Sequence, residues 1–325
     1  MKNNYFALVL CLAVNLNVDQ CFAENSSTLF GPWHDHGSEV TLSGAFFPES
    51  ITADWDGTLY VSSIATGEIV KIPAHSSTPE TFVEIGVNTN STGLMVDVWR
   101  EVLWSCDVDL SMQSPSELRA FSLSSAELLA TYPLPDGGLC ADITLSDDGS
   151  LFVTDTLLAR VLKLETPSHY SPQQGELSIW SADPVLVGSP ENFLKINGIT
   201  YSRNHSIYTT NYSTGTLYRI HINHDGSAGE VEIIETDQPL FFPDGIEMVG
   251  RNHLLVSQNT GSLVKIKINK NQGQVSVIDD SLDQPTSVAR VWGQVWVTEG
   301  QILRFVGVDP SPLNFPFKIR RISLH

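Results

Sequence analysis

The stretch Ile51-Thr52-Ala53-Asp54-Trp55-Asp56-Gly57-Thr58-Leu59-Tyr60-Val61 sets the pattern of this chain. It reads as a short apolar strand, a polar turn with an Asp-Gly pair suited to tight hairpins, and a second strand with an aromatic residue. The same succession of first strand, turn and second strand returns five more times, with an aromatic residue in four of these five second strands. The six first strands carry Ile51, Leu94, Ile143, Ile199, Ile246 and Val288, and the second strands begin at Leu59, Val102, Leu151, Ile207, Leu254 and Val295.

The spacing of these hairpins predicts the fold. The positions two residues before the first-strand anchors, here called the column, are Glu49, Thr92, Ala141, Asn197, Asp244 and Thr286. They lie 43, 49, 56, 47 and 42 residues apart, and a period near 40–50 residues with several short strands is typical of a β-propeller. We therefore expect an all-β fold, a six-bladed β-propeller; a parallel solenoid would need shorter repeats. Residues 38–42 and 317–322 could each close the ring, and the sequence leaves open which forms the outermost strand.

The start of the chain predicts export. Residues 1–23 combine Lys2, an apolar stretch over 5–14 and a small-residue cleavage site at Cys21-Phe22-Ala23, as in a secretory signal. The apolar run is too short to span a bilayer. We expect cleavage near Ala23, a secreted or periplasmic protein, and a single propeller domain over residues 24–325.

Two cysteines, Cys106 and Cys140, would remain after cleavage. They fall on the same rim of adjacent blades, so they could form a disulfide or remain as two separate buried thiols, and the sequence does not decide between these alternatives. The formal charge of −19 argues against nucleic acid and anionic membranes as partners. The oligomeric state is not indicated.

Ring closure brings the column residues together around one axis. Three of them, Glu49, Asn197 and Asp244, offer carboxylate or amide oxygens, which calcium prefers. We predict a metal site there, for Ca²⁺ or another divalent cation. Each residue alone could instead belong to a turn, as in Asn197-Gly198.

Further polar residues are expected near the same rim. Asp155, Asn211 and Glu299 end second strands and are candidates to support the metal ligands or to touch a substrate, and Asp142 could orient a ligand or face a neighbouring blade. The chain has no Gly-x-Ser-x-Gly, His-Glu-x-x-His or Cys-x-x-Cys motif, which disfavours serine-hydrolase and zinc chemistry.

The chain resembles the gluconolactonase/regucalcin (senescence marker protein) family, in particular its exported bacterial members. The residues that carry the resemblance are 47–51, 56–61, 140–143, 148–155, 197–199 and 243–246. The resemblance implies a six-bladed propeller with calcium held by Glu49, Asn197 and Asp244, and Asp244 as general base or nucleophile. It implies a small lactone or ester as substrate. Ala141 departs from the family, which commonly has Asn there, and so lacks one metal contact.

We therefore expect a calcium-dependent lactonase-type hydrolase. A non-catalytic ligand- or protein-binding propeller is the alternative that Ala141 favours, because a lost ligand is what a retired site would show. A strictosidine-synthase-like enzyme, which shares the propeller but not these ligands, is a third reading.

Overall fold

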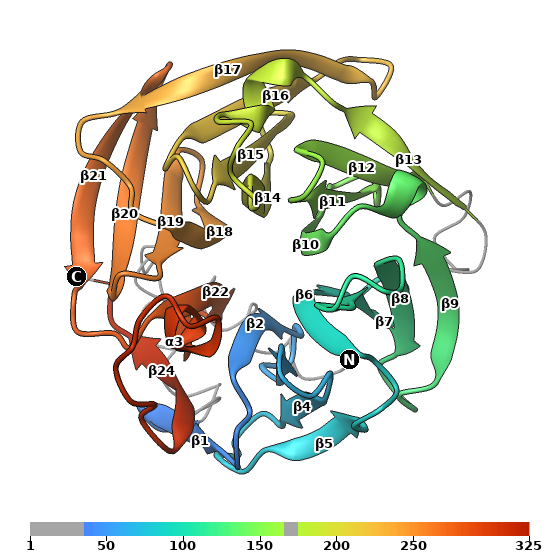
Figure 1. The fold of residues 1–325 in the computed structure, drawn as a ribbon, viewed down its shortest axis with the longest axis vertical. Helices are drawn as coiled ribbons and strands as arrows, with labels where there is room; N and C mark the ends of the chain where they lie inside the picture. The colour runs from blue at the N-terminus through green and yellow to red at the C-terminus, as the bar shows by residue number, and fades with distance from the viewer. Residues whose placement is uncertain (1–35, 166–174, 325) are drawn as a thin grey trace, which may run out of the picture. The chain divides into compact units, whose positions relative to one another are not determined.

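The computed structural model describes residues 36–165 and 175–324, which consist mainly of antiparallel strands. Figure 1 shows the strands arranged as blades around a common axis, and this confirms the predicted six-bladed, all-β propeller. The predicted signal segment, 1–23, lies outside the described residues. Within the described residues no helix is long and apolar enough to cross a membrane.

Each blade is a four-stranded antiparallel sheet. Blade 1 contains β2 (Pro48–Ala53), β3 (Leu59–Ser63), β4 (Ile69–Ile72) and β5 (Glu80–Val83), and blade 2 contains β6 (Asn90–Asp97), β7 (Val102–Val108), β8 (Glu117–Ser122) and β9 (Leu128–Pro133). Blade 3 contains β10 (Cys140–Leu145), β11 (Leu151–Asp155), β12 (Arg160–Glu165) and β13 (Glu176–Ser181), and blade 4 contains β14 (Ile196–Ser202), β15 (Ser206–Asn211), β16 (Leu217–Ile222) and β17 (Ala228–Thr236). Blade 5 contains β18 (Pro243–Val249), β19 (His253–Gln258), β20 (Ser262–Asn269) and β21 (Gln272–Asp279).

Blade 6 is built from both ends of the described chain. It contains β22 (Pro285–Val291), β23 (Gln294–Glu299), β24 (Phe317–Ile322) and β1 (Glu39–Leu42). β1 pairs with β24 in antiparallel register, with Glu39 opposite Arg320 and Leu42 opposite Phe317. The amino-terminal strand is therefore the outermost strand, which settles the alternative left open by the sequence. Short helical turns occur in three connections: η1 (Pro135–Gly137), η2 (Pro184–Val187) and α3 (Ile302–Phe305).

The hydrophobic core lies between neighbouring blades. One cluster joins Tyr60 and Ile69 of blade 1 to Leu103 and Phe121 of blade 2, and all four are buried. Burying one such side chain stabilises the fold by about 1.5–3 kcal/mol, so repeated aromatic and aliphatic pairs hold the ring together. This is why the second strands repeat an apolar–aromatic pattern.

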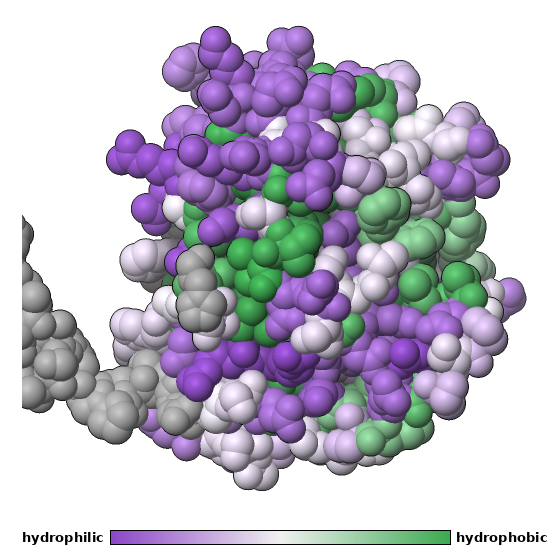
Figure 2. Space-filling model, turned by 90° about the vertical axis from the view of Figure 1, so that its left-hand side faces the viewer, coloured by the Kyte–Doolittle hydropathy of each residue, from purple (hydrophilic) through white to green (hydrophobic). Residues whose placement is uncertain are grey.

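A disulfide joins blades 2 and 3, and parallel strand pairing joins blades 4 and 5. A disulfide connects Cys106 of β7 to Cys140 of β10, with Cα atoms 5.5 Å apart, so the structure favours the bridge over two thiols. Blades 4 and 5 are joined at their outer edges, where β17 pairs with β21 in parallel through Glu235–Gln272 and Thr236–Gly273. The two blades thereby form one eight-stranded sheet. Figure 2 shows this side of the molecule, which is largely hydrophilic with an apolar area near its middle.

Candidate functional site at the propeller axis

The column residues occupy a bulge at the start of each inner strand. The pairing register shifts between Pro48 and Ile51, between Ile196 and Ile199, and between Pro243 and Ile246, with equivalent shifts in the other three blades. A bulge re-aims the side chains within it, and here it turns column residues toward the axis. Asn197-Gly198 and Asp244-Gly245 therefore lie inside strands and are not hairpin turns.

Glycines after the column residues allow the inner strands to approach one another. A Cβ at position 198 would lie 2.0 Å from the carbonyl oxygen of Asp244, and one at 245 would lie 2.6 Å from Cα of Ser287. No side chain fits at such distances, so these positions require glycine. The Asn-Gly and Asp-Gly pairs thus combine a side chain aimed at the axis with a backbone that packs against the next blade.

Hydroxyl groups from the second strands help to hold the column in all blades but the second. The fourth residue of every second-strand motif is Ser or Thr: Ser62, Ser105, Thr154, Thr210, Ser257 and Thr298. Thr154 Oγ1 donates to the carbonyl of Asn197 at 2.6 Å, and Ser257 Oγ donates to that of Thr286 at 2.9 Å. Sequence reasoning missed these hydroxyl hydrogen bonds, although the sequence shows Ser or Thr at the same position of all six second strands.

The exception lies between blades 2 and 3. Ser105 Oγ bonds to Ser91 Oγ at 2.9 Å within its own blade, and the Cys106–Cys140 disulfide joins the two blades beside it. The column residue at this place is Ala141, which offers no side-chain oxygen. Blades 2 and 3 are therefore joined by the disulfide and by the hydrogen bond that Thr92 Oγ1 donates to the carbonyl of Cys140 at 3.0 Å.

The structure brings Glu49, Asn197 and Asp244 together. Asn197 Nδ2 donates to Asp244 Oδ1 at 2.8 Å. These three side chains and Asp142 line a cavity of about 10 Å³, enough for roughly one water molecule or one ion. Because the amide nitrogen of Asn197 faces Asp244, its carbonyl oxygen is left for another partner.

Asp142 adds a third carboxylate to this group. Its Oδ2 accepts a hydrogen bond from the backbone N–H of Ile199 at 3.1 Å, so it faces blade 4, one of the two roles predicted for it. Burial raises the pKa of Asp142 to about 7, although backbone hydrogen bonds oppose the shift. An ionised Asp142 would add negative charge close to the column carboxylates.

The column carboxylates also have raised pKa values. Burial is the main cause of the rise in the pKa of Asp244 to about 7, with Asp142 adding repulsion and hydrogen bonds from Asn259 and Asn197 opposing it. The pKa of Glu49 is raised well above its usual range by burial and then by repulsion from Asp244 and Asp142. A nearby positive charge would favour the ionised form of these carboxyls and lower their pKa values.

Two residues that sequence reasoning missed hold Asp244 from the other side. Asn259, fully buried, donates from Nδ2 to Asp244 Oδ2 at 2.9 Å and to the carbonyl of Pro285 at 2.8 Å. The Tyr212 hydroxyl donates to Asn259 Oδ1 at 2.6 Å. Both oxygens of Asp244 therefore accept amide hydrogen bonds, which fixes the carboxylate. Asn259 belongs to an Asn-Thr-Gly connection, and nothing local in that sequence indicates contact with Asp244.

The donor set fits a hard cation in its chemistry. Glu49 and Asp244 supply carboxylate oxygens and Asn197 an amide oxygen, the ligand types that calcium takes from proteins. Among the described residues no group of three or more His, Cys, Asp or Glu side chains is placed to hold a metal ion. The oxygen donors that could face a cation here are thus two carboxylates and one amide.

The three residues that end second strands, Asp155, Asn211 and Glu299, form hydrogen bonds with the connections that precede their blades. Asp155 accepts from Arg160 Nε at 2.8 Å and from the N–H of Leu139 at 2.9 Å. Asn211 donates to the carbonyl of Leu186 at 3.1 Å. Each ties the connection before its own blade to the second strand, and a role toward substrate stays a prediction.

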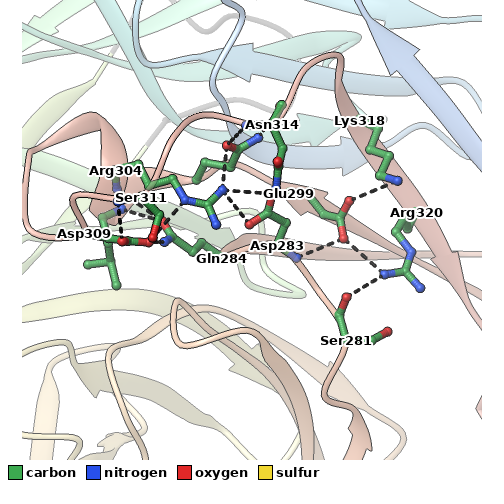
Figure 3. A network of polar contacts seen from close by, with 12 residues as sticks. Ser281, Asp283, Gln284, Glu299, Arg304, Asp309, Ser311, Asn314, Lys318 and Arg320 are labelled. Atoms are coloured by element: carbon green, nitrogen blue, oxygen red, sulfur yellow. Dashed lines mark hydrogen bonds and ion pairs between the residues drawn. The ribbon is translucent and has the colours of Figure 1, made fainter.

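Glu299 makes the same kind of link in blade 6. It accepts from the N–H of Asp283 at 3.0 Å and from Arg320 at 3.1 Å. Figure 3 shows it between Lys318 and Arg320, beside a network centred on Arg304. Its charge is compensated on the outer side of the blade, where it supports the connection preceding β22.

The axial space continues below the site. A cavity of about 220 Å³ shares Ser50, Asp142 and Ser287 with the small one and is also lined by Glu247 and Arg290. Burial is the main cause of the rise in the pKa of Glu247 to about 7, opposed by Arg290. The axis is thus polar along its length, with the column residues nearest the end where the inner strands begin.

Comparison with known proteins shows the fold but no family. No family model matches the chain, and no curated protein matches it in sequence. Among solved structures, a calcium-binding protein, regucalcin, from Agrobacterium tumefaciens superposes with a TM-score of 0.63 at 14% identity, covering 89% of this chain and 94% of that one.

Other similar structures differ in function. Virginiamycin B lyase from Staphylococcus aureus, solved with quinupristin, has a TM-score of 0.58 at 15% identity and covers 80% of each chain. A nidogen/laminin complex has a TM-score of 0.55 at 19% identity, covering 74% of this chain and 84% of that one. Propellers of this shape thus include both enzymes and protein-binding modules, so function must be argued from the site.

Proposed function

We propose that this protein is an exported lactonase-type hydrolase that uses a divalent cation, calcium by preference, at the axis. The observation that carries the proposal is the meeting of Glu49, Asn197 and Asp244, from three blades, around a space for one ion. A structural neighbour that is a calcium-binding propeller supports it. The Cys106–Cys140 disulfide supports secretion or a periplasmic location, where such bridges persist.

Glu49, Asn197 and Asp244 would hold the cation. When bound, a divalent cation supplies Lewis acidity toward a carbonyl oxygen. We assign Asp244 the role of base or nucleophile, in which it would accept a proton from an attacking water or attack the carbonyl directly. Asn259 keeps the carboxylate oriented through its 2.9 Å bond, while Tyr212 fixes the amide of Asn259.

A binding propeller without catalysis is the second candidate. Ala141 favours it because a column position that could have carried a fourth oxygen donor carries a methyl group. The two candidates differ in one requirement: the hydrolase needs the cation and Asp244 together, whereas a binding module needs neither.

Metal content and turnover test the proposal together. The purified mature protein should bind one calcium per chain, and Asp244→Ala should lose it; Asp244→Asn should hydrolyse lactones and aryl esters far more slowly than the parent. Asp280→Asn is the matched control, because it removes an exposed carboxylate away from the axial cavity. Absence of bound calcium together with no calcium-dependent thermal shift would favour the binding module.

A further inference from the structure

A large cavity lies at the face where the inner strands end, away from the column. Its volume is about 800 Å³, within the range typical of small-molecule sites, and it is lined mainly by β10, β14, β18 and the hairpins that follow them. These three strands lie side by side around the axis (Figure 1). The cavity shares Met95, Thr144, Glu247 and Arg290 with the 220 Å³ axial cavity, so it adjoins the axis at the end opposite the proposed metal site.

Hydrogen bonds between blades hold the inner strands that line this cavity. Thr144 Oγ1 of blade 3 accepts from the N–H of Tyr201 in blade 4 at 3.0 Å. Thr200 Oγ1 of blade 4 accepts in the same way from the N–H of Met248 in blade 5 at 3.2 Å. Both threonines are buried. The three blades are therefore joined where they meet the cavity, and a ligand would bind a preformed surface, which lowers the entropic cost of binding.

Three arginines from three different blades line this cavity, which we call the arginine cavity. Arg203 follows β14, Arg251 follows β18, and Arg290 lies near the end of β22. Arg203 lies 3.7 Å from Asp147, with both side chains largely exposed. Within residues 36–165 and 175–324, the guanidinium groups of Arg251 and Arg290 have no hydrogen bond or salt bridge. Because the chain has a formal charge of −19, this grouping of positive charge runs against its overall composition.

Several arginines elsewhere in the chain are held by carboxylates. Arg119 Nη2 lies 2.7 Å from Asp107 Oδ2, and Arg304 Nη1 lies 2.8 Å from Asp283 Oδ1 in the network of Figure 3. An anion could bind such arginines only by competing with their own carboxylates. At Arg251 and Arg290 no carboxylate of the described chain has to be displaced, so their guanidinium donors are available to an oxyanion.

The remaining lining residues indicate which anion fits. Met95, Leu145 and Met248 line the arginine cavity and are partly buried, and methionine side chains adapt to apolar groups of varied shape. Asp147 and Glu247 line it as well. Three positive and two negative side chains leave one positive charge, which matches a singly charged anion better than a doubly charged one. The lining therefore suits a carboxylate attached to an apolar group.

We propose that the arginine cavity binds small organic carboxylates that carry an alkyl or aryl group. Arg251 and Arg290 compensate the charge of the carboxylate, and its apolar part lies against Met95 and Met248. This site is at the other end of the axis from Glu49, Asn197 and Asp244, and it goes beyond the proposed hydrolase activity without depending on it.

Isothermal titration calorimetry with 4-phenylbutyrate tests the proposal, with 4-phenylbutyramide as an uncharged comparison of nearly the same shape. The parent should bind the carboxylate about tenfold more tightly than the amide, because hydrogen bonds to a charged acceptor are about twice as strong as neutral ones. Arg251→Gln and Arg290→Gln should each weaken carboxylate binding about three- to tenfold and leave amide binding unchanged. Lys267→Gln is the matched control, since Lys267 is an exposed cation on β20 that does not line the cavity.

The Asp244→Asn variant separates this cavity from the proposed metal site. It should bind 4-phenylbutyrate with the affinity of the parent, whether or not the parent hydrolyses lactones. Loss of binding in Asp244→Asn would place the carboxylate at the column and overturn the inference. Absence of binding to the parent, equal affinity for the carboxylate and the amide, or an equal loss in Lys267→Gln and the two arginine variants would also overturn it. Each of these results leaves the proposed hydrolase to be judged by its own assay.

Discussion

Removing the disulfide between blades 2 and 3 is the sharpest test of how the ring is held. Cys106 and Cys140 are both buried, so a serine pair would also bury two hydroxyls, and the Cys106→Ala/Cys140→Ala pair is the cleaner change. The bridge spans a sequence separation of 34 residues, for which loop entropy gives a loss of about 4 kcal/mol in the free energy of unfolding.

For a domain of this size that loss corresponds to a fall in Tm of about 6–8 °C. Differential scanning calorimetry on the parent, the alanine pair and the reduced parent would measure it, and the last two should agree within about 2 °C. A fall below about 2 °C would refute the reasoning, because it would mean that the bridge does not constrain the unfolded chain. A fall shared by the alanine pair but not by the reduced parent would assign the effect to packing.

Three further outcomes follow from the axial site. In the presence of a chelator, Tm should fall as pH rises from about 5 to 8. The reason is that Asp142 and Asp244, with pKa values near 7 in the folded state, retain protons that the unfolded chain releases near pH 4. Added calcium should abolish this pH dependence, and a Tm that rises with pH in chelator would contradict the explanation. Gly198→Ala should lower the free energy of unfolding by more than about 2 kcal/mol in urea titrations and weaken calcium binding, since its methyl group would meet the Asp244 carbonyl; unchanged stability would show that the strands can separate. Asn259→Ala should reduce turnover about tenfold with calcium still bound, and Tyr212→Phe should reduce it less; equal loss in both would place the tyrosine nearer the chemistry than its contacts indicate.

Much of the fold was predictable because the residues that form each blade repeat the same local sequence pattern. Each hairpin carries its own anchor, turn and apolar second strand, so six copies indicate six blades and place Glu49, Asn197 and Asp244 at one axis. The same logic put Cys106 and Cys140 on one rim. It could not say whether the two sulfur atoms face each other, because that depends on side-chain direction across two blades.

Other parts of the site depend on contacts that no local pattern specifies. Asn259 sits in a turn of blade 5, and only the packing of that turn against β18 and β22 brings its amide to Asp244. Asp155 and Glu299 were expected at the same rim as the column, as candidates to support the metal ligands or to touch a substrate. Their side chains accept hydrogen bonds from arginines and from the backbone of the connections before their blades. Sequence periodicity gives the height of a residue along the axis but not the direction in which it points.

The parallel pairing of β17 with β21 has a mechanical consequence. In the described chain the other four blades are separate four-stranded sheets, whereas blades 4 and 5 share one eight-stranded sheet. Asn197 and Asp244, which bond to each other at the axis, belong to these two blades. We expect the shared sheet to restrain the distance between the Asn197 amide and the Asp244 carboxylate when blades move relative to one another. Glu49 belongs to blade 1, so movement between blades would change its distance to this pair more readily.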